Sequence, residues 1–168
     1  MTGGPTIRPL APADTAAVAE IYAHYVEHTA ITFDLEAPPA AEWARRLAAA
    51  EGLPWLACAV DGRLAGFAYA GRFRPKRAYQ PTVETTIYLH HAAGGRGLGR
   101  LLYGALLDVV AAGGFHTAVA GVTLPNPASV ALHERLGFAP VGVFSEVGHK
   151  LGRWHDVGFW LRRFEKGR

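Results

Sequence analysis

Apolar positions along the chain switch between a helical and a strand-like spacing, which predicts an α/β order of elements. Helical spacing predicts helices over residues 15–28, 39–51, 96–110 and 127–136. Apolar runs and alternating patterns predict strands over residues 6–10, 54–60, 64–72, 82–90, 117–124, 138–145 and 152–161. Residues 146–151 are expected to connect the last two strands. This order predicts a mixed central sheet of about seven strands with helices on both faces.

Turn and cap signals mark where several of these elements end. Asp61-Gly62, between two predicted strands, predicts a hairpin turn. Asn126 followed by Pro127 predicts a helix start, with Asn126 as the cap and Pro127 as the first helical residue. The 168 residues show no internal repeat or linker, so we expect one domain spanning residues 1–168.

The composition limits the classes of partner. Half of the residues are hydrophobic, 18% are charged, and the net charge is +3. The scattered basic residues suit a small anionic ligand better than nucleic acid, which is not an expected partner. The single cysteine, Cys58, has no partner for an internal disulfide. With no signal-peptide pattern and no long apolar span, we expect a cytoplasmic protein and no membrane partner.

A glycine loop, residues 94–100 with the sequence GGRGLGR, lies between a predicted strand and a predicted helix. Glycines let the backbone approach an anion, and the first free N–H groups of a helix point at it. The spacing matches neither G-x-G-x-x-G nor G-x-x-x-x-G-K-[ST]. The loop therefore predicts a pyrophosphate seated on one helix end, and a glycine-rich turn without a ligand is the alternative.

Two sets of motifs resemble a known family. The order of elements, the glycine loop and residues 132–138 (LHERLGF) resemble the GNAT N-acetyltransferase superfamily over essentially the whole chain. Residues 77–79 (RAY), 82–84 (TVE) and 152–156 (GRWHD) are similar to the more specific signatures of its phosphinothricin acetyltransferase branch. The resemblance implies the GNAT acyl-CoA N-acyltransferase fold. It also implies an acetyl-CoA-dependent enzyme that acetylates the α-amine of phosphinothricin, methionine sulfoximine or methionine sulfone.

The same resemblance implies where acetyl-CoA binds. The glycine loop would hold the pyrophosphate, and strand N–H groups would stabilise the thioester carbonyl as it gains negative charge. Asn126 would meet a cofactor amide or only cap its helix. The expected cofactor-binding residues are Ile87, Tyr88, Leu89, Gly95, Arg96, Gly97, Leu98, Gly99, Arg100, Asn126 and Ser129.

Acetylation of an amino acid needs a base, because its α-amine is protonated at neutral pH. Glu84 is the first candidate, since burial in an otherwise apolar strand would raise its pKa. The alternative is a carboxylate paired with an arginine for structure. His133 is the second candidate base, or a histidine packed on a helix face. Tyr88 is either the proton donor to the leaving thiolate or a packing residue.

The substrate's anionic groups need cations, and Arg77 could bind a carboxylate through two hydrogen bonds. The alternative is that this basic loop is only solvated. The expected substrate-binding residues are Phe33, Arg77, Ala78, Tyr79, Glu84, Lys150 and Trp154. No histidine spacing indicates a metal. Aromatic residues in the last strands, together with the resemblance, predict a homodimer. The alternative functions are acetylation of peptide or protein amines and non-catalytic sensing of acyl-CoA.

Overall fold

The structure is a computed structural model that describes residues 3–165. Its strands are β1 (Thr6–Pro9), β2 (Trp55–Val60), β3 (Arg63–Arg72), β4 (Thr82–Leu89), β5 (Thr117–Leu124), β6 (Ala139–Lys150) and β7 (Arg153–Arg163). Its helices are α1 (Thr15–His28), α2 (Ala40–Ala48), α3 (Leu98–Ala112) and α4 (Pro127–Arg135). Short 3-10 turns are η1 (Pro12–Asp14), η2 (Arg77–Tyr79) and η3 (His91–Ala93).

The seven strands form one twisted sheet in the order β1-β2-β3-β4-β5-β7-β6. Every neighbouring pair is antiparallel except β4 and β5, which are parallel and are joined through α3. The predicted mixed α/β sheet is therefore confirmed. The predicted hairpin at Asp61-Gly62 is confirmed as well, with both residues at positive φ between β2 and β3.

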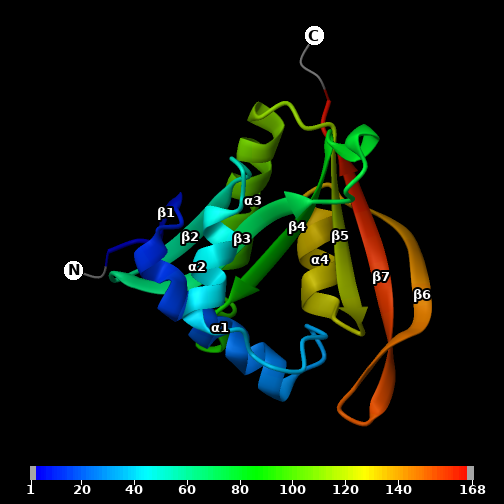
Figure 1. The fold of residues 1–168 in the computed structure, drawn as a ribbon, viewed down its shortest axis with the longest axis horizontal. Coiled ribbons are helices and arrows are strands. Elements are labelled where there is room, and N and C mark those ends of the chain that lie inside the picture. Colours follow the sequence, from blue (N-terminus) through cyan, green and yellow to red (C-terminus); the bar gives the residue numbers. More distant parts are fainter. Residues whose placement is uncertain (1–2, 166–168) are drawn as a thin grey trace.

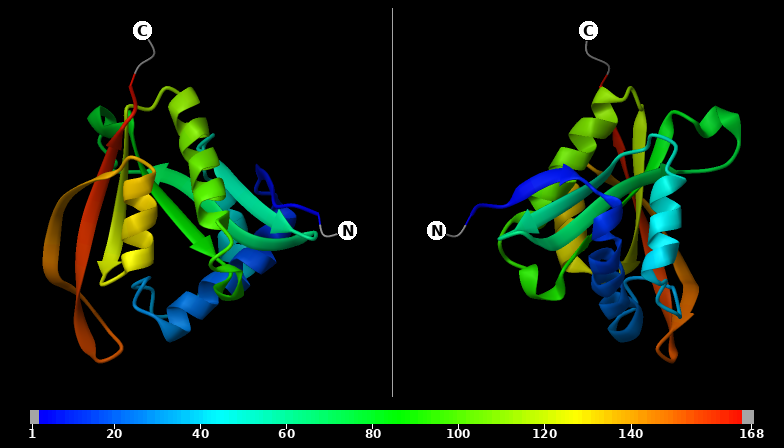
Figure 2. Two further views of the ribbon diagram at one scale, coloured as in Figure 1. Left: turned by 180° about the vertical axis from the view of Figure 1, so that it is seen from behind. Right: turned by 60° about the vertical axis from the view of Figure 1, so that its left-hand side comes forward.

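Helices cover both faces of the sheet, as predicted (Figure 2). On one face α3 presents a buried stripe that includes Leu102 and Leu106 and packs in one cluster with Trp160 of β7. On the other face α1 and α2 enclose a smaller cluster, in which the rings of Trp43 and Phe67 meet edge to face at 5.5 Å. These two cores hold the helices against the strands that carry the site.

The strands β4 and β5 separate soon after they start. Their pairing runs from Thr82 opposite Thr117 to Glu84 opposite Val119 and then stops. Each strand keeps its other neighbour beyond that point: β4 pairs with β3 from Val83 to Leu89, and β5 pairs with β7 along its full length. The two strands therefore diverge toward their carboxyl ends and leave a wedge in the sheet (Figure 1).

The helix ends differ from the predicted ones by a few residues for local reasons. The helix predicted from Arg96 begins at Leu98, because Gly97 before it takes a left-handed conformation with φ of 73°. The helix predicted to reach Glu51 ends at Ala48, and Glu51 itself has a positive φ of 50°. By contrast, α4 starts as predicted, and the side chain of Asn126 accepts a hydrogen bond from the Ser129 N–H.

The prediction that residues 146–151 connect the last two strands is wrong. Strand β6 continues to Lys150, and the turn consists of Leu151 and Gly152 alone. A bulge between Phe144 and Gly148 places Glu146 at a φ of 52°. Because a bulge interrupts the alternation of side chains, the sequence there lacks a strand pattern. The result is a long hairpin at the edge of the sheet (Figure 1).

Within residues 3–165, no helix has the length and apolar character that a bilayer crossing requires.

Candidate active site

A cavity of about 310 Å³ lies at the wedge between β4 and β5. Its walls come from β4, β5, β7, α4 and the loop after α1. The lining residues are Ile31, Thr32, Phe33, Glu84, Thr85, Thr86, Ile87, Tyr88, Gly121, Val122, Thr123, Ser129, His133, Val157 and Phe159. The cavity therefore joins six residues predicted for the site: Phe33, Glu84, Ile87, Tyr88, Ser129 and His133.

Side chains of β4 reach both faces of the sheet around this cavity. Tyr88 packs with the α1–α2 cluster, whereas Ile87 packs with the α3–α4 cluster. Since strand side chains alternate, Glu84 and Thr86 lie on the α1–α2 face with Tyr88. Two ligand parts could thus approach the wedge from opposite faces and meet between the strands.

Glu84 is the only acidic or basic side chain, apart from His133, among the lining residues. It is half-buried, and burial raises the pKa of its carboxyl above the ordinary value of 4.5, while the positive charge of Arg74 opposes that shift. A carboxyl with a raised pKa accepts protons more readily than an exposed one. Its geometry and environment suit a general base.

His133 is buried, with 4% of its surface exposed. Its Nδ1 lies 2.7 Å from the carbonyl oxygen of Ser129, and its Nε2 lies 3.1 Å from the hydroxyl of Tyr103. Burial lowers the pKa of the imidazole below 6.5. Both ring nitrogens thus have partners within the chain, and the ring is neutral at physiological pH.

Tyr88 lies among aromatic rings. Its ring meets those of Tyr22 and Tyr25 at centroid distances of 5.0 and 5.1 Å. Burial raises the pKa of the Tyr88 hydroxyl, which therefore keeps its proton at every physiological pH. It can donate a hydrogen bond into the cavity.

The loop after α1 carries Phe33 and is fastened at two places. The hydroxyl of Tyr22 lies 2.5 Å from the Thr32 hydroxyl and donates to Asp34 over 2.7 Å. Lys150 at the end of β6 is 6% exposed, and its ammonium donates to the Thr32 carbonyl oxygen over 2.8 Å. Burial lowers the pKa of Lys150. Lys150, predicted to bind the substrate, thus contacts the loop and does not line the cavity.

Four more predicted substrate-binding residues also lie outside the lining. Arg77, Ala78 and Tyr79 are exposed in η2, and Trp154 is 60% exposed on β7, where its ring meets that of His149. The positive charge that lowers the pKa of Glu84 is that of Arg74, in the same loop as η2.

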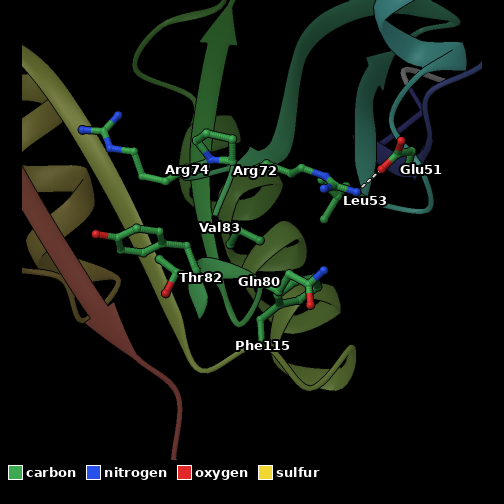
Figure 3. Close-up of a pocket in the computed structure, with 10 residues that line it drawn as sticks. Glu51, Leu53, Arg72, Arg74, Gln80, Thr82, Val83 and Phe115 are labelled. Atoms are coloured by element: carbon green, nitrogen blue, oxygen red, sulfur yellow. Dashed lines mark hydrogen bonds and ion pairs between the residues drawn. The ribbon is translucent and has the colours of Figure 1, made fainter. Parts of the chain in front are cut away.

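A second, smaller cavity of about 170 Å³ lies beyond the other end of β4 (Figure 3). There Arg72 points toward Glu51 and pairs with it, while Arg74 extends in the opposite direction. Thr82 and Phe115 form part of its wall. Its one acidic residue, Glu51, is paired with Arg72, so it offers no free base comparable to Glu84.

The glycine loop fits an anionic group. Gly95 and Gly97 have φ values of 75° and 73°, and a β carbon at Gly94, Gly95 or Gly97 would meet no atom within 4 Å. The loop surface is therefore open to a ligand at the start of α3. The first N–H groups of this helix have no partner in the helix itself and can bind a pyrophosphate.

Sequence reasoning missed the contribution of β5, whose Gly121, Val122 and Thr123 line the cavity. Residues 117–124 form a largely apolar run, which predicted a strand but no site residue. Gly121 and Thr123 interrupt that apolar run, and this interruption was the available signal. Tyr103, which contacts His133, was read only as part of a helix, because 30 residues separate the pair.

Comparisons with known proteins show the family to which the chain is similar. Residues 7–159 match the family model described as "Acetyltransferase (GNAT) domain". A phosphinothricin N-acetyltransferase of Streptomyces viridochromogenes is 45% identical over 160 residues, covering 95% of this chain and 87% of the relative. An L-methionine sulfoximine/L-methionine sulfone acetyltransferase of Salmonella typhimurium is 40% identical over 159 residues, covering 92% and 91%.

A solved structure has the same fold. It is a GNAT superfamily phosphinothricin acetyltransferase from Sinorhizobium meliloti in complex with acetyl-CoA. The TM-score is 0.93 at 35% identity, and the match covers 97% of this chain and 90% of the other. Fold and site thus define an acyl-transfer enzyme. The chain belongs to the GNAT family of N-acetyltransferases, as its motifs predicted.

Proposed function

We propose that this enzyme transfers the acetyl group of acetyl-CoA to the α-amine of a small amino acid of the phosphinothricin, methionine sulfoximine or methionine sulfone type. The observation that carries the proposal is Glu84, a half-buried carboxyl with a raised pKa in the wedge between β4 and β5. The names of the two relatives support this class of substrate.

The two substrates bind on opposite faces of the wedge. Acetyl-CoA supplies an activated acetyl group, and the glycine loop at the start of α3 is the proposed site for its pyrophosphate. Beyond Glu84, the edge of β4 that faces β5 has no strand partner. Backbone N–H groups around Ile87, Tyr88 and Leu89 can therefore bind the acyl arm.

The amine approaches from the α1–α2 face, where Glu84 lies. Glu84 takes the proton from the ammonium, which leaves a neutral amine able to attack the thioester carbonyl. Tyr88 can hold a hydrogen bond to the departing sulfur. Hydroxyls of Thr86 and Thr123 on the lining suit the side-chain oxygens of a sulfone, sulfoximine or phosphinate.

The substrate carboxylate needs a cation that the lining itself does not contain. Arg74 is the best placed, since its charge acts on Glu84. Arg77 remains the proposed second anchor, from the exposed turn η2. A bound carboxylate beside Glu84 would hold the α-amine close to the base.

We also infer a homodimer. Strand β6 is the outer strand of the sheet, and apolar side chains on it are exposed, among them Val141 at 65% and Phe144 at 60%. An exposed, apolar edge strand favours association. Light scattering at micromolar concentration should give twice the chain mass, and Phe144→Glu should lower it. A wild-type monomer would contradict the inference.

The function is tested by thiol release from acetyl-CoA with phosphinothricin as the acceptor. Wild-type protein should release CoA and form N-acetylphosphinothricin, detected by mass spectrometry. Glu84→Gln should keep the fold and lose most of this activity. Acetylation of peptides alone, with no free amino acid accepted, would exclude the proposed substrate class.

A further inference from the structure

A glycine interrupts the buried strand β5 at the cavity wall. Gly121 is exposed, although its neighbours in the strand, Ala120 and Val122, are buried and pack with the α3–α4 cluster. Because strand side chains alternate, Gly121 faces the α1–α2 side, where Glu84 lies. A glycine inside a strand weakens it and often marks a place where a ligand approaches the backbone closely.

The ring of Phe159 lies over this glycine. Phe159 of β7 is the partner of Gly121 in the sheet. A β carbon at Gly121 would lie 3.3 Å from Cε1 of Phe159 and 3.7 Å from Cγ1 of Val157. Both side chains line the cavity. Beyond the cavity, the Phe159 ring meets that of Phe144 on β6 at a centroid distance of 5.1 Å. Two apolar side chains therefore close the β7 side of the cavity.

The register of the sheet connects Glu84 to this surface. Glu84 pairs with Val119, and Gly121 is the next residue of β5 on the same face. An amino acid whose amine lies at Glu84 can thus extend its side chain over the bare backbone of Gly121. Such a side chain ends against Phe159 and Val157.

We infer that Phe159 sets the length of the acceptor side chain: its ring, lying over Gly121, is the end wall of the cavity that a terminal methyl group reaches and a longer alkyl group does not pass. The inference rests on the proposed function and adds to it a residue that selects among acceptors. Phosphinothricin, methionine sulfone and methionine sulfoximine all carry a methyl group on their phosphorus or sulfur atom. Burial of that methyl group against an apolar wall is favourable.

A purely structural role for Phe159 makes a different prediction. An aromatic ring beside a strand glycine can serve only to cover the exposed backbone. Loss of such a cover would destabilise the sheet and affect all acceptors alike. Loss of an end wall would instead change which length of side chain is preferred. The ratio of kcat/KM between a short and a long acceptor therefore separates the two roles.

The test compares methionine sulfoximine with buthionine sulfoximine, which differ only in a methyl or a butyl group on sulfur. CoA release at saturating acetyl-CoA gives kcat/KM for each. The wild type should prefer the methyl compound by roughly tenfold or more, and Phe159→Ala should reduce this preference by roughly tenfold or more, because the space left by the ring accepts the longer chain. Leu161→Ala is the matched control. Leu161 lies on the same face of β7 outside the cavity lining, so its variant should keep the wild-type ratio.

Circular dichroism shows whether each variant is folded. If Phe159→Ala does not fold, Phe159→Leu replaces it and should shift the ratio in the same direction by a smaller factor. Equal kcat/KM for the two compounds in the wild type overturns the inference. It is also overturned if the folded Phe159 variant keeps the wild-type ratio, or if Leu161→Ala changes the ratio as much. A wild type that does not acetylate methionine sulfoximine at all contradicts the proposed function, and the inference with it.

Discussion

The ring of Phe33 lies directly against the backbone of Gly148, so closely that a β carbon at Gly148 would collide with it. Gly148 belongs to β6 and Phe33 to the loop after α1, which lines the cavity. Lys150, two residues further along β6, binds the same loop through the Thr32 carbonyl. The edge hairpin thus sets the position of a cavity wall far from it in the sequence.

This contact predicts that Gly148→Ala displaces Phe33. We expect KM for the amino acid to rise several-fold, KM for acetyl-CoA to stay unchanged, and the free energy of unfolding to fall by about 1–3 kcal/mol, as overpacking does. Gly142→Ala on the same strand is the control, because a β carbon there meets no atom within 4 Å. Equal kinetics for both variants would show that Phe33 does not shape the substrate side.

Gly97→Val tests the glycine loop. The left-handed backbone at Gly97 disfavours a branched side chain by about 1–2 kcal/mol, and the new side chain would occupy the proposed pyrophosphate site. Gly114, beyond the other end of α3, has a similar φ of 80° and equally open surroundings. Calorimetry should therefore show similar destabilisation for Gly97→Val and Gly114→Val, but weaker acetyl-CoA binding only for Gly97→Val. Equal affinities would remove the loop from the cofactor site.

The sequence predicted best those features that short-range chemistry determines. Asn126 caps its helix and Asp61-Gly62 forms its hairpin because both signals act within a few residues. The bulge at Glu146 escaped prediction because it removes the alternation that marks a strand. Candidate site residues on β4 and α4 could be named from motifs. The Tyr103–His133 bond and the role of Lys150 could not, since they depend on how distant elements pack.

The raised pKa of Glu84 predicts an acid limb in the activity profile. The carboxyl acts as a base only when ionised, so kcat/KM for the amine should fall as the pH drops through that raised pKa, above the ordinary value of 4.5. Glu84→Gln should lower kcat by roughly a hundredfold or more. The loss of activity relative to the wild type should be smaller at high pH, where free amine is abundant. Glu51→Gln, at the second cavity, is the control and should keep the wild-type profile.

Arg74 is expected to tune this profile. Its positive charge holds the pKa of Glu84 below the value that burial alone would give. Arg74→Gln should therefore move the acid limb to higher pH and raise KM for the amino acid. Arg72→Gln is the matched control, because Arg72 pairs with Glu51 (Figure 3). If both substitutions moved the limb equally, a general loss of positive charge would explain the effect.

Selectivity between methionine and its oxidised analogues tests the account most directly. The cavity that holds Glu84 is also lined by threonine hydroxyls, which favour substrates whose side chain carries oxygens at a tetrahedral centre. The measurement is kcat/KM for methionine, methionine sulfone and methionine sulfoximine with saturating acetyl-CoA. The sulfone and sulfoximine should exceed methionine by roughly ten- to a hundredfold, as expected when buried polar groups lose their partner. Equal turnover of methionine and its sulfoximine would contradict the proposed substrate class.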